Sequence, residues 1–277
     1  MQPWRLPTSL PMKKRLVIQY LSLVLLHSSW GPELKWLCNP VLSCHSCVLS
    51  WFACPIGVFV HFSGYHLVPW LPLGMVLLAG VFLGRLLCGW VCPFGLLQDL
   101  LHKIPSQKIS LPPWTSYAKY ILLVFMVFLI PYFLGESTLY SFCRICPAGT
   151  LQASLPSAIA AGFASLQTAT LVRWGVLLVI LGFAILSARS FCKALCPLGA
   201  LLAPLNYLSF WTIQAPPETC LSCKKCDAAC SMDIQPSIRI NRGIPANRDP
   251  ECIVCHECQA ACVHGKTEGA SAGISNP

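Results

Sequence analysis

The sequence predicts an all-α membrane domain with about four transmembrane helices, followed by a small, cysteine-rich α+β domain at the C-terminus. The first observation behind this prediction is composition. Of 277 residues, 55% are hydrophobic and 10% are charged, whereas a soluble domain carries about 25% charged residues. The second is that the last eight of the 18 cysteines form two matching runs. We therefore expect a membrane domain over residues 1–210 and a second domain over residues 211–277.

Four apolar stretches are the candidate membrane spans. They cover residues 16–30, 67–84, 117–134 and 171–188. Several are shorter than the ~20 residues that a helix needs to cross a bilayer. Residues 41–62 could form a fifth span, but this would reverse the side of every later loop. We expect that segment to be re-entrant or interfacial instead, because reversal would break the charge asymmetry described next.

Lysine and arginine gather on one side of this arrangement. The residues before the first stretch, between the second and third, and directly after the fourth are Arg5, Lys13, Lys14, Arg15, Arg85, Lys103, Lys108, Lys119, Arg189 and Lys193. The other side holds only Lys35, Arg144 and Arg173. Cytoplasmic loops carry the excess of positive charge. We therefore expect a multi-pass protein of a bacterial-type inner membrane with both termini in the cytoplasm, its first stretch an uncleaved helix.

The net charge of +9 is located in the membrane part of the chain. From Arg189 onward the sequence contains eight Lys and Arg and seven Asp and Glu, so the net charge of the tail is close to zero. A positive excess beside the spans fits orientation and contact with lipid. The pattern therefore predicts lipid as a partner and no binding to nucleic acid.

The tail repeats one cysteine spacing, Cys-x2-Cys-x2-Cys-x3-Cys. The runs are Cys220, Cys223, Cys226 and Cys230, then Cys252, Cys255, Cys258 and Cys262. Bacterial two-cluster ferredoxins bind a pair of 4Fe–4S clusters with this spacing, and the fourth cysteine of each run serves the other cluster. We therefore expect Cys262 to complete the first cluster and Cys230 the second. Zinc ribbons use paired Cys-x2-Cys motifs instead. The proline that usually follows the fourth cysteine is replaced by Ser231 and Val263, which weakens only the local turn prediction.

A second motif occurs twice in the membrane part. It consists of Arg, Cys-x3-Cys-Pro and a Gly two residues after the proline, over residues 85–95 and 189–199. Both copies follow an apolar stretch on the cytoplasmic side, which indicates an internal repeat of a two-helix unit. The inner cysteines are Cys88, Cys92, Cys192 and Cys196. Three interpretations stay open for them: a further membrane-domain cluster, redox-active dithiols, or free thiols packed as small hydrophobes.

Six outer cysteines lie on the opposite side of the predicted membrane. They are Cys38, Cys44, Cys47, Cys54, Cys143 and Cys146. An oxidising compartment favours disulfides, for example between Cys44 and Cys47 or between Cys143 and Cys146. We interpret the set as outer redox thiols. A further cluster is less favoured here, because six cysteines do not divide into fours.

These motifs together resemble a known family. Paired Cys-x3-Cys-Pro motifs on a four-span domain with a two-cluster tail are similar to the ferredoxin-type membrane proteins of the periplasmic nitrate reductase (its quinol dehydrogenase membrane component) and methylamine-utilisation systems. The C-terminal half of the membrane regulator of nitrous oxide reductase is similar too. The resemblance covers residues 67–263 and implies electron transfer from a quinol or a cytoplasmic donor to an extracytoplasmic redox enzyme. The outer segments at residues 44–57 and 143–147 are additional to the pattern of the nitrate reductase member.

A few polar side chains are further candidates. A quinol site needs a proton acceptor at the bilayer edge, and His61, His66, Glu33 and Glu136 map there. They could equally be interfacial side chains in contact with water, and a histidine pair could ligate haem. Asp99 follows the first inner motif, and we expect it to be solvated on an amphipathic helix.

The sequence contains no catalytic triad, phosphate loop or dinucleotide-binding fingerprint. We therefore expect an electron carrier or an oxidoreductase subunit rather than a stand-alone enzyme, with redox partner proteins on one or both sides of the membrane and quinone as a candidate cofactor. Two alternatives stay open. One is a redox-sensing or metalloenzyme-assembly protein, and the other is a transmembrane thiol–disulfide relay built on the outer cysteines.

Overall fold

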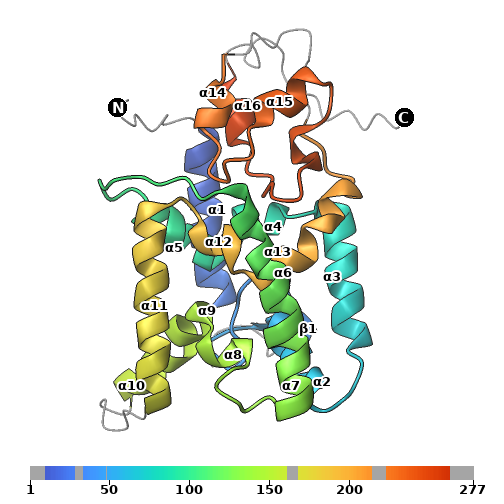
Figure 1. Cartoon of the computed structure of the whole chain (residues 1–277), viewed down its shortest axis with the longest axis vertical. Helices are drawn as coiled ribbons and strands as arrows, with labels where there is room; N and C mark the ends of the chain where they lie inside the picture. The colour runs from blue at the N-terminus through green and yellow to red at the C-terminus, as the bar shows by residue number, and fades with distance from the viewer. Residues whose placement is uncertain (1–9, 29–33, 48, 161–167, 214–222, 263–277) are drawn as a thin grey trace.

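The computed structural model describes residues 10–28, 34–47, 49–160, 168–213 and 223–262. Four long helical segments form the body, with the C-terminal domain at one end (Figure 1). The segments are α1 (Leu10–Leu26), α3 (Trp70–Leu83), the continuous α6 (Ala118–Leu122), η2 (Leu123–Leu129) and α7 (Ile130–Leu134), and α11 (Thr168–Leu186). Their direction alternates, so the start of α1 and the end of α11 lie at the same end as the C-terminal domain. Helices are confirmed in all four apolar stretches.

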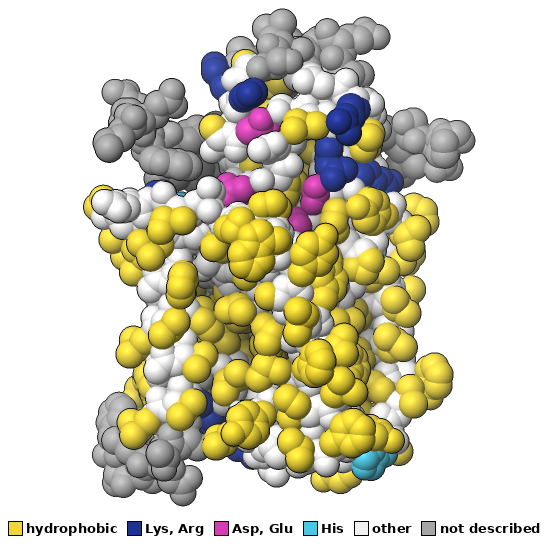
Figure 2. Space-filling model, in the orientation of Figure 1, with side chains coloured by type: hydrophobic (Ala, Val, Ile, Leu, Met, Phe, Trp, Pro, Cys, Tyr) yellow, Lys and Arg dark blue, Asp and Glu magenta, His cyan; other side chains and the backbone are white. Residues whose placement is uncertain are grey.

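These helices expose apolar side chains outward. Val17, Leu78 and Leu178 are each at least 60% exposed, and hydrophobic side chains cover the body below the charged end in Figure 2. Among the described residues, only Pro113–Leu134, with 22 residues, is long and apolar enough to cross a membrane by itself. The four-span topology therefore stays a prediction. In this helix, the wide turns of η2 precede Pro131, whose ring lacks an N–H and would clash with the carbonyl four residues earlier in a regular helix.

The outer end contains short elements packed between the long helices. Its helices are α2 (Pro55–Gly64), α8 (Phe142–Ile145), α9 (Pro147–Gly149), η3 (Thr150–Ser154) and α10 (Leu155–Ala160). The all-α prediction needs one correction, because β1 (Leu34–Cys38) pairs in parallel with β2 (Phe52–Ala53). Between these strands, Val41, Leu42 and Ser43 are buried. Residues 41–62 are thus a buried loop, a strand and a short helix rather than one continuous span.

The inner end repeats one local structure. The helix α4 (Leu86–Trp90), a Cys-Pro turn and α5 (Pro93–Leu101) follow α3, while α12 (Ser190–Ala194), a Cys-Pro turn and α13 (Pro197–Leu202) follow α11. The short turns η1 (Pro113–Tyr117) and η4 (Pro204–Tyr207) begin the third long segment and end the second repeat. The two-helix repeat expected from the sequence is present in the backbone.

The described part of the C-terminal domain is helical. It contains α14 (Lys225–Ala228), α15 (Pro236–Asn241), η6 (Ala246–Arg248) and α16 (Glu257–Ala261). Residues 223–262 include no strand, so strands of the expected α+β domain are not found in this part of the tail. One hydrophobic core runs from Val41 and Phe59 at the outer end, through the inner motifs, to Ile253 of the tail. Burial of each such side chain stabilises the fold by about 1.5–3 kcal/mol.

Candidate functional site

The four inner cysteines are all buried, each 9% exposed or less. Cys92 and Cys196 precede the first residue of α5 and α13, with extended backbones and a proline next. Proline suits the first helical position because it needs no hydrogen-bond acceptor there and its φ is already helical. The sulfur of Cys196 then accepts a hydrogen bond from the Gly199 N–H at 3.3 Å. In the second motif, the Cys-Pro-x-Gly sequence therefore aims the sulfur of Cys196 back at the start of its own helix.

The two repeats interlock through their arginines. A Cβ atom added at Gly199 would lie 3.0 Å from the guanidinium of Arg85, and one added at Gly95 would lie 3.4 Å from the guanidinium of Arg189. Each repeat thus inserts its arginine beside the glycine of the other. Arg85 and Arg189 are 1% and 0% exposed. From the sequence they are expected on the cytoplasmic side and begin each motif, but nothing in one copy of the motif points to the exchange.

Arg189 is neutralised by Asp99. Its Nε donates to Oδ1 at 2.8 Å and its Nη2 to Oδ2 at 2.7 Å, a bidentate pair, while Nη1 donates to the Cys88 carbonyl at 3.1 Å. Arg15 of α1 also pairs with Asp99. Burial acts to raise the pKa of Asp99, but the two guanidiniums outweigh it, so this pKa lies below its ordinary value. The expectation that Asp99 is solvated was wrong, because a buried guanidinium requires a carboxylate partner.

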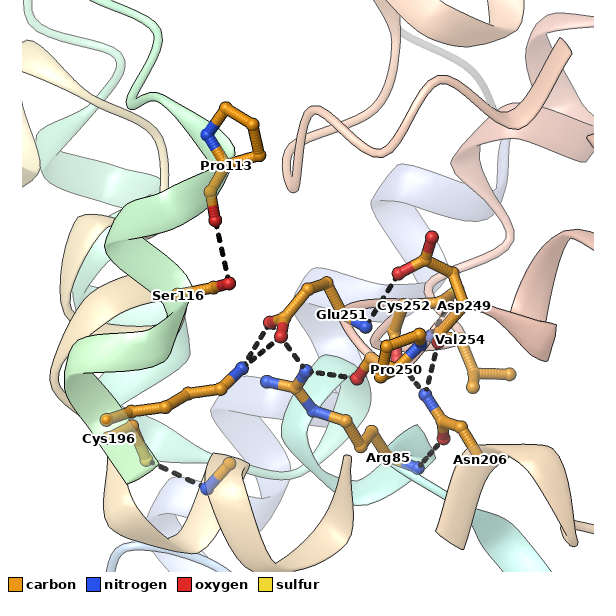
Figure 3. Close-up of polar contacts among 12 residues, drawn as sticks. Arg85, Pro113, Ser116, Cys196, Asn206, Asp249, Pro250, Glu251, Cys252 and Val254 are labelled. Carbon is orange, nitrogen blue, oxygen red and sulfur yellow. Dashed lines mark hydrogen bonds and ion pairs between the residues drawn. The ribbon is translucent and has the colours of Figure 1, made fainter. Parts of the chain in front are cut away.

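Arg85 takes its partner from the tail. Its Nη1 donates to the Pro250 carbonyl at 2.7 Å and to Oε2 of Glu251 at 3.2 Å. Lys119 of α6 donates to both oxygens of the same carboxylate. Figure 3 shows Arg85 and Glu251 facing each other across the boundary between the two domains. The C-terminal tail therefore supplies the counter-ion of a residue buried in the helical body.

Asn206 and Gly89 complete this junction. The amide of Asn206 accepts from the Arg85 N–H at 2.9 Å and donates to the carbonyls of Asp249 and Cys252 at 2.9 and 2.7 Å (Figure 3). A Cβ at Gly89 would lie 2.3 Å from the Ile253 carbonyl oxygen. The second cysteine run of the tail thus sits directly on the first inner motif.

Within the tail, four cysteines line one apolar cavity. They are Cys230, Cys252, Cys255 and Cys258, the set that the spacing assigns to the second cluster, with Cys230 contributed by the other run. Burial raises the pKa of Cys252 to about 12, so it is a thiol unless a metal binds. Of the first set, Cys220 lies outside the described residues. Cys223 is exposed, and Cys226 and Cys262 are half-buried.

The structure divides the six outer cysteines into four and two. Cys44, Cys54, Cys143 and Cys146 line one cavity of about 60 Å³. Cys38 and Cys47 are buried but do not line it. The missed sequence signal is Cys-Pro-x-Gly, which occurs at residues 54–57 and 146–149 as well as in the two inner motifs. Across the described chain, no three His, Cys, Asp or Glu side chains are placed to hold a single metal ion.

The polar candidates of the outer end fall near this cavity. His61 Nδ1 and Glu136 Oε2 lie 2.5 Å apart, and both line an adjoining cavity of about 420 Å³ with Cys44 and Cys143. His66 packs edge-on against Tyr132, with ring centroids 4.3 Å apart. Glu33 lies outside the described residues.

Comparison with known proteins gives the class of this site. The family model of a 4Fe–4S binding domain matches residues 65–112 and 170–212, which contain the two inner motifs. An uncharacterised protein of Methanocaldococcus jannaschii is 27% identical over 198 residues, 68% of this chain and 73% of that protein. The putative electron transport protein YccM of Escherichia coli is 27% identical over 71% of this chain and 54% of its own length.

Two further relatives extend this comparison. Protein NirI of Paracoccus denitrificans and the regulatory protein NosR of Pseudomonas aeruginosa are each 28% identical, over 66% and 62% of this chain. The chain spans only 26% and 23% of their lengths. No solved structure matches. The resemblance is confirmed: the chain matches the model of a 4Fe–4S binding domain, and it is similar to an electron transport protein and to NirI and NosR.

The close contact at Gly89 predicts that adding a single methyl group there lowers the stability of the protein. Gly89→Ala should loosen the tail from the first inner motif, because its Cβ would overlap the Ile253 carbonyl. We expect a loss of about 1–3 kcal/mol in the free energy of unfolding, as for an overpacked core, measured in mild detergent. Gly74→Ala is the matched control, since a Cβ there meets nothing within 4 Å. Equal stability of the two variants would contradict the docking.

The arginine pairs predict a contrast between buried and exposed ions. Asp99→Asn leaves Arg189 with a neutral partner and should cost about 3–5 kcal/mol of unfolding free energy, the range for breaking a buried pair. Glu136→Gln is the control. It changes the partner of His61, and the two side chains are 39% and 51% exposed, so the cost should be about 0–1 kcal/mol. Denaturant titration of both variants tests this, and similar costs would be the contrary result.

Proposed function

We propose that this protein is a membrane-bound electron carrier that passes electrons between a quinol or cytoplasmic donor and an extracytoplasmic redox partner. In this proposal the eight tail cysteines hold two 4Fe–4S clusters, and the four inner cysteines hold a third. The observation that carries it is the docking of the second tail run on the first inner motif through Arg85, Asn206 and Gly89. Bound clusters would supply one-electron carriage at each set.

The inner cysteines suit an anionic group. Around them, four cations (Arg15, Arg85, Lys119 and Arg189) pair with three carboxylates (Asp99, Glu251 and Glu257). One positive charge therefore remains, and a negative centre held by four thiolates would need it in a medium of low dielectric constant. Two sulfurs also have N–H donors, since Gln98 Nε2 lies 3.2 Å from Cys192 and the Gly199 N–H lies 3.3 Å from Cys196. Such bonds stabilise thiolate and raise the reduction potential of a bound cluster.

The experiment that tests the inner set is an assay of iron and acid-labile sulfide on anaerobically purified, full-length chain. Cys88→Ala combined with Cys192→Ala should lower the content by about four irons and four sulfides per chain relative to wild type. Cys47→Ala, at a buried cysteine outside every proposed set, is the control and should lower neither. Unchanged iron in the double variant would show that the inner cysteines are dithiols or packed thiols.

The residues at the outer end support a quinol as the electron donor. His61 Nδ1 and Glu136 Oε2 lie 2.5 Å apart on the wall of a cavity of about 420 Å³, where a neutral imidazole hydrogen-bonded to a carboxylate can accept a proton released by a quinol. His61→Gln should lower the rate of reduction by a quinol analogue by about 100-fold or more without changing iron content. His66→Gln is the control, because His66 packs on Tyr132 instead. Equal rates in the two variants would exclude this role.

A second candidate function is regulation. One relative is named a regulatory protein, NosR, and clusters in such a protein could report redox state without sustained flow. The number of electrons that each chain transfers distinguishes a carrier from a sensor. A carrier reduces many equivalents of acceptor per chain, while a sensor stops after the equivalents that its own clusters store.

A further inference from the structure

The structure points to a further 4Fe–4S site at the outer end of the membrane domain, and we propose that Cys44, Cys54, Cys143 and Cys146 are its ligands. This inference rests on the proposed function, because it assumes that the protein carries iron–sulfur clusters. The sequence alone disfavoured a cluster here, since six outer cysteines do not divide into fours. The fold removes that objection by placing four of them around one cavity and leaving Cys38 and Cys47 outside it.

The cavity has room for more than a single water, and its lining suits an iron–sulfur cluster. Besides the four cysteines, its wall is formed mainly by apolar side chains such as Leu42, Ile56 and Phe142. Its volume of about 60 Å³ is several times the ~10–15 Å³ that a single water needs. It is larger than the cavity of about 10 Å³ around the four tail cysteines, which the spacing assigns to a cluster. The sulfurs are not placed around one ion, whereas in a cubane each thiolate binds a different iron.

Two of the four ligands repeat the geometry of the inner site. Cys54 and Cys146 precede Pro55 and Pro147 with φ, ψ of −70°, 126° and −60°, 122°, close to the −64°, 118° of Cys92. Each of these cysteines directly precedes a helix that begins at the proline, as Cys196 precedes α13. The same four-residue unit thus places each of these cysteines at the start of a helix.

Of the other two ligands, Cys143 lies in α8, just before Cys146 in the chain, and Cys44 is brought in by tertiary contacts. The Cys44 N–H donates to Oε1 of Gln152 at 2.7 Å, and Nε2 of Gln152 donates to the Leu42 carbonyl at 3.3 Å. These bonds fix the buried loop against the segment that follows Cys146. A Cβ at Gly149 would lie 3.6 Å from the Cys44 sulfur, so the two cysteine segments meet at this glycine.

The outer site also adjoins the inner one. Leu42 lines the outer cavity, and its backbone lies beside the sulfur of Cys92 in the same buried core. A single residue therefore touches both sets of cysteines. The outer site therefore lies next to a second cysteine site, with which it could exchange electrons. An isolated pair of surface thiols would have no such neighbour.

The test compares two double variants of the full-length chain, purified anaerobically in detergent. Cys54→Ala with Cys146→Ala should lose about four irons and four sulfides per chain relative to wild type, together with one component of the Mössbauer spectrum. Cys38→Ala with Cys47→Ala changes two buried outer cysteines that do not line the cavity, and it should lose neither. If the first variant does not accumulate, Cys44→Ala at a half-buried position replaces it, and one spectral component should again be lost or altered.

Several results would overturn the inference. These are equal iron in the two double variants, one zinc per chain that Cys54→Ala with Cys146→Ala removes while iron and sulfide stay unchanged, or outer thiols that become alkylatable only after a disulfide reductant is added. Each leaves the proposed function standing if the inner and tail iron is present. Failure of the proposed function looks different, because wild type itself would then contain no iron or sulfide.

Discussion

The structure depends on the burial of two guanidinium groups in an apolar core. Arg85 and Arg189 are almost fully enclosed, and a buried charge without a partner costs several kcal/mol. Arg189 finds Asp99 within the helical body, but Arg85 must take Glu251 from the tail. The charge balance of the helical body is therefore incomplete without the tail. Because Glu251 directly precedes Cys252, neutralising Arg85 also fixes the second cysteine run over the inner motifs.

This constraint orders the cysteines along the long axis of the molecule. The tail set, the inner set and the outer set are connected by short contacts: the Cys252 carbonyl with Asn206, and Leu42 with both Cys92 and the outer cavity. The same Cys-Pro-x-Gly unit serves the inner and outer ends. In the proposed function, the chain's own residues hold each set at a fixed place, supply positive charge and N–H donors around the inner sulfurs, and keep water from them by burial.

The sequence predicted the features that depend on local pattern. The four apolar helices and the repeated two-helix unit follow from runs of hydrophobic residues and from motif spacing, and both are present. What failed depended on contacts between distant segments. Asp99 looks solvated on its own helix, but Arg189 lies 90 residues away. The choice of four outer cysteines from six requires the approach of residues 44–54 to residues 143–146, which no spacing encodes. The parallel pairing of β1 with β2 was missed because a two-residue strand has no periodicity.

The most direct test of the central claim is electron flow across a bilayer. Full-length protein would be reconstituted in sealed vesicles with an impermeant oxidant trapped inside and an impermeant reductant added outside. The account predicts that wild type reduces the trapped oxidant through many turnovers, and that Cys88→Ser combined with Cys192→Ser stops this flow while the tail clusters are still reduced. Undiminished flow through that variant would contradict a path through the membrane domain.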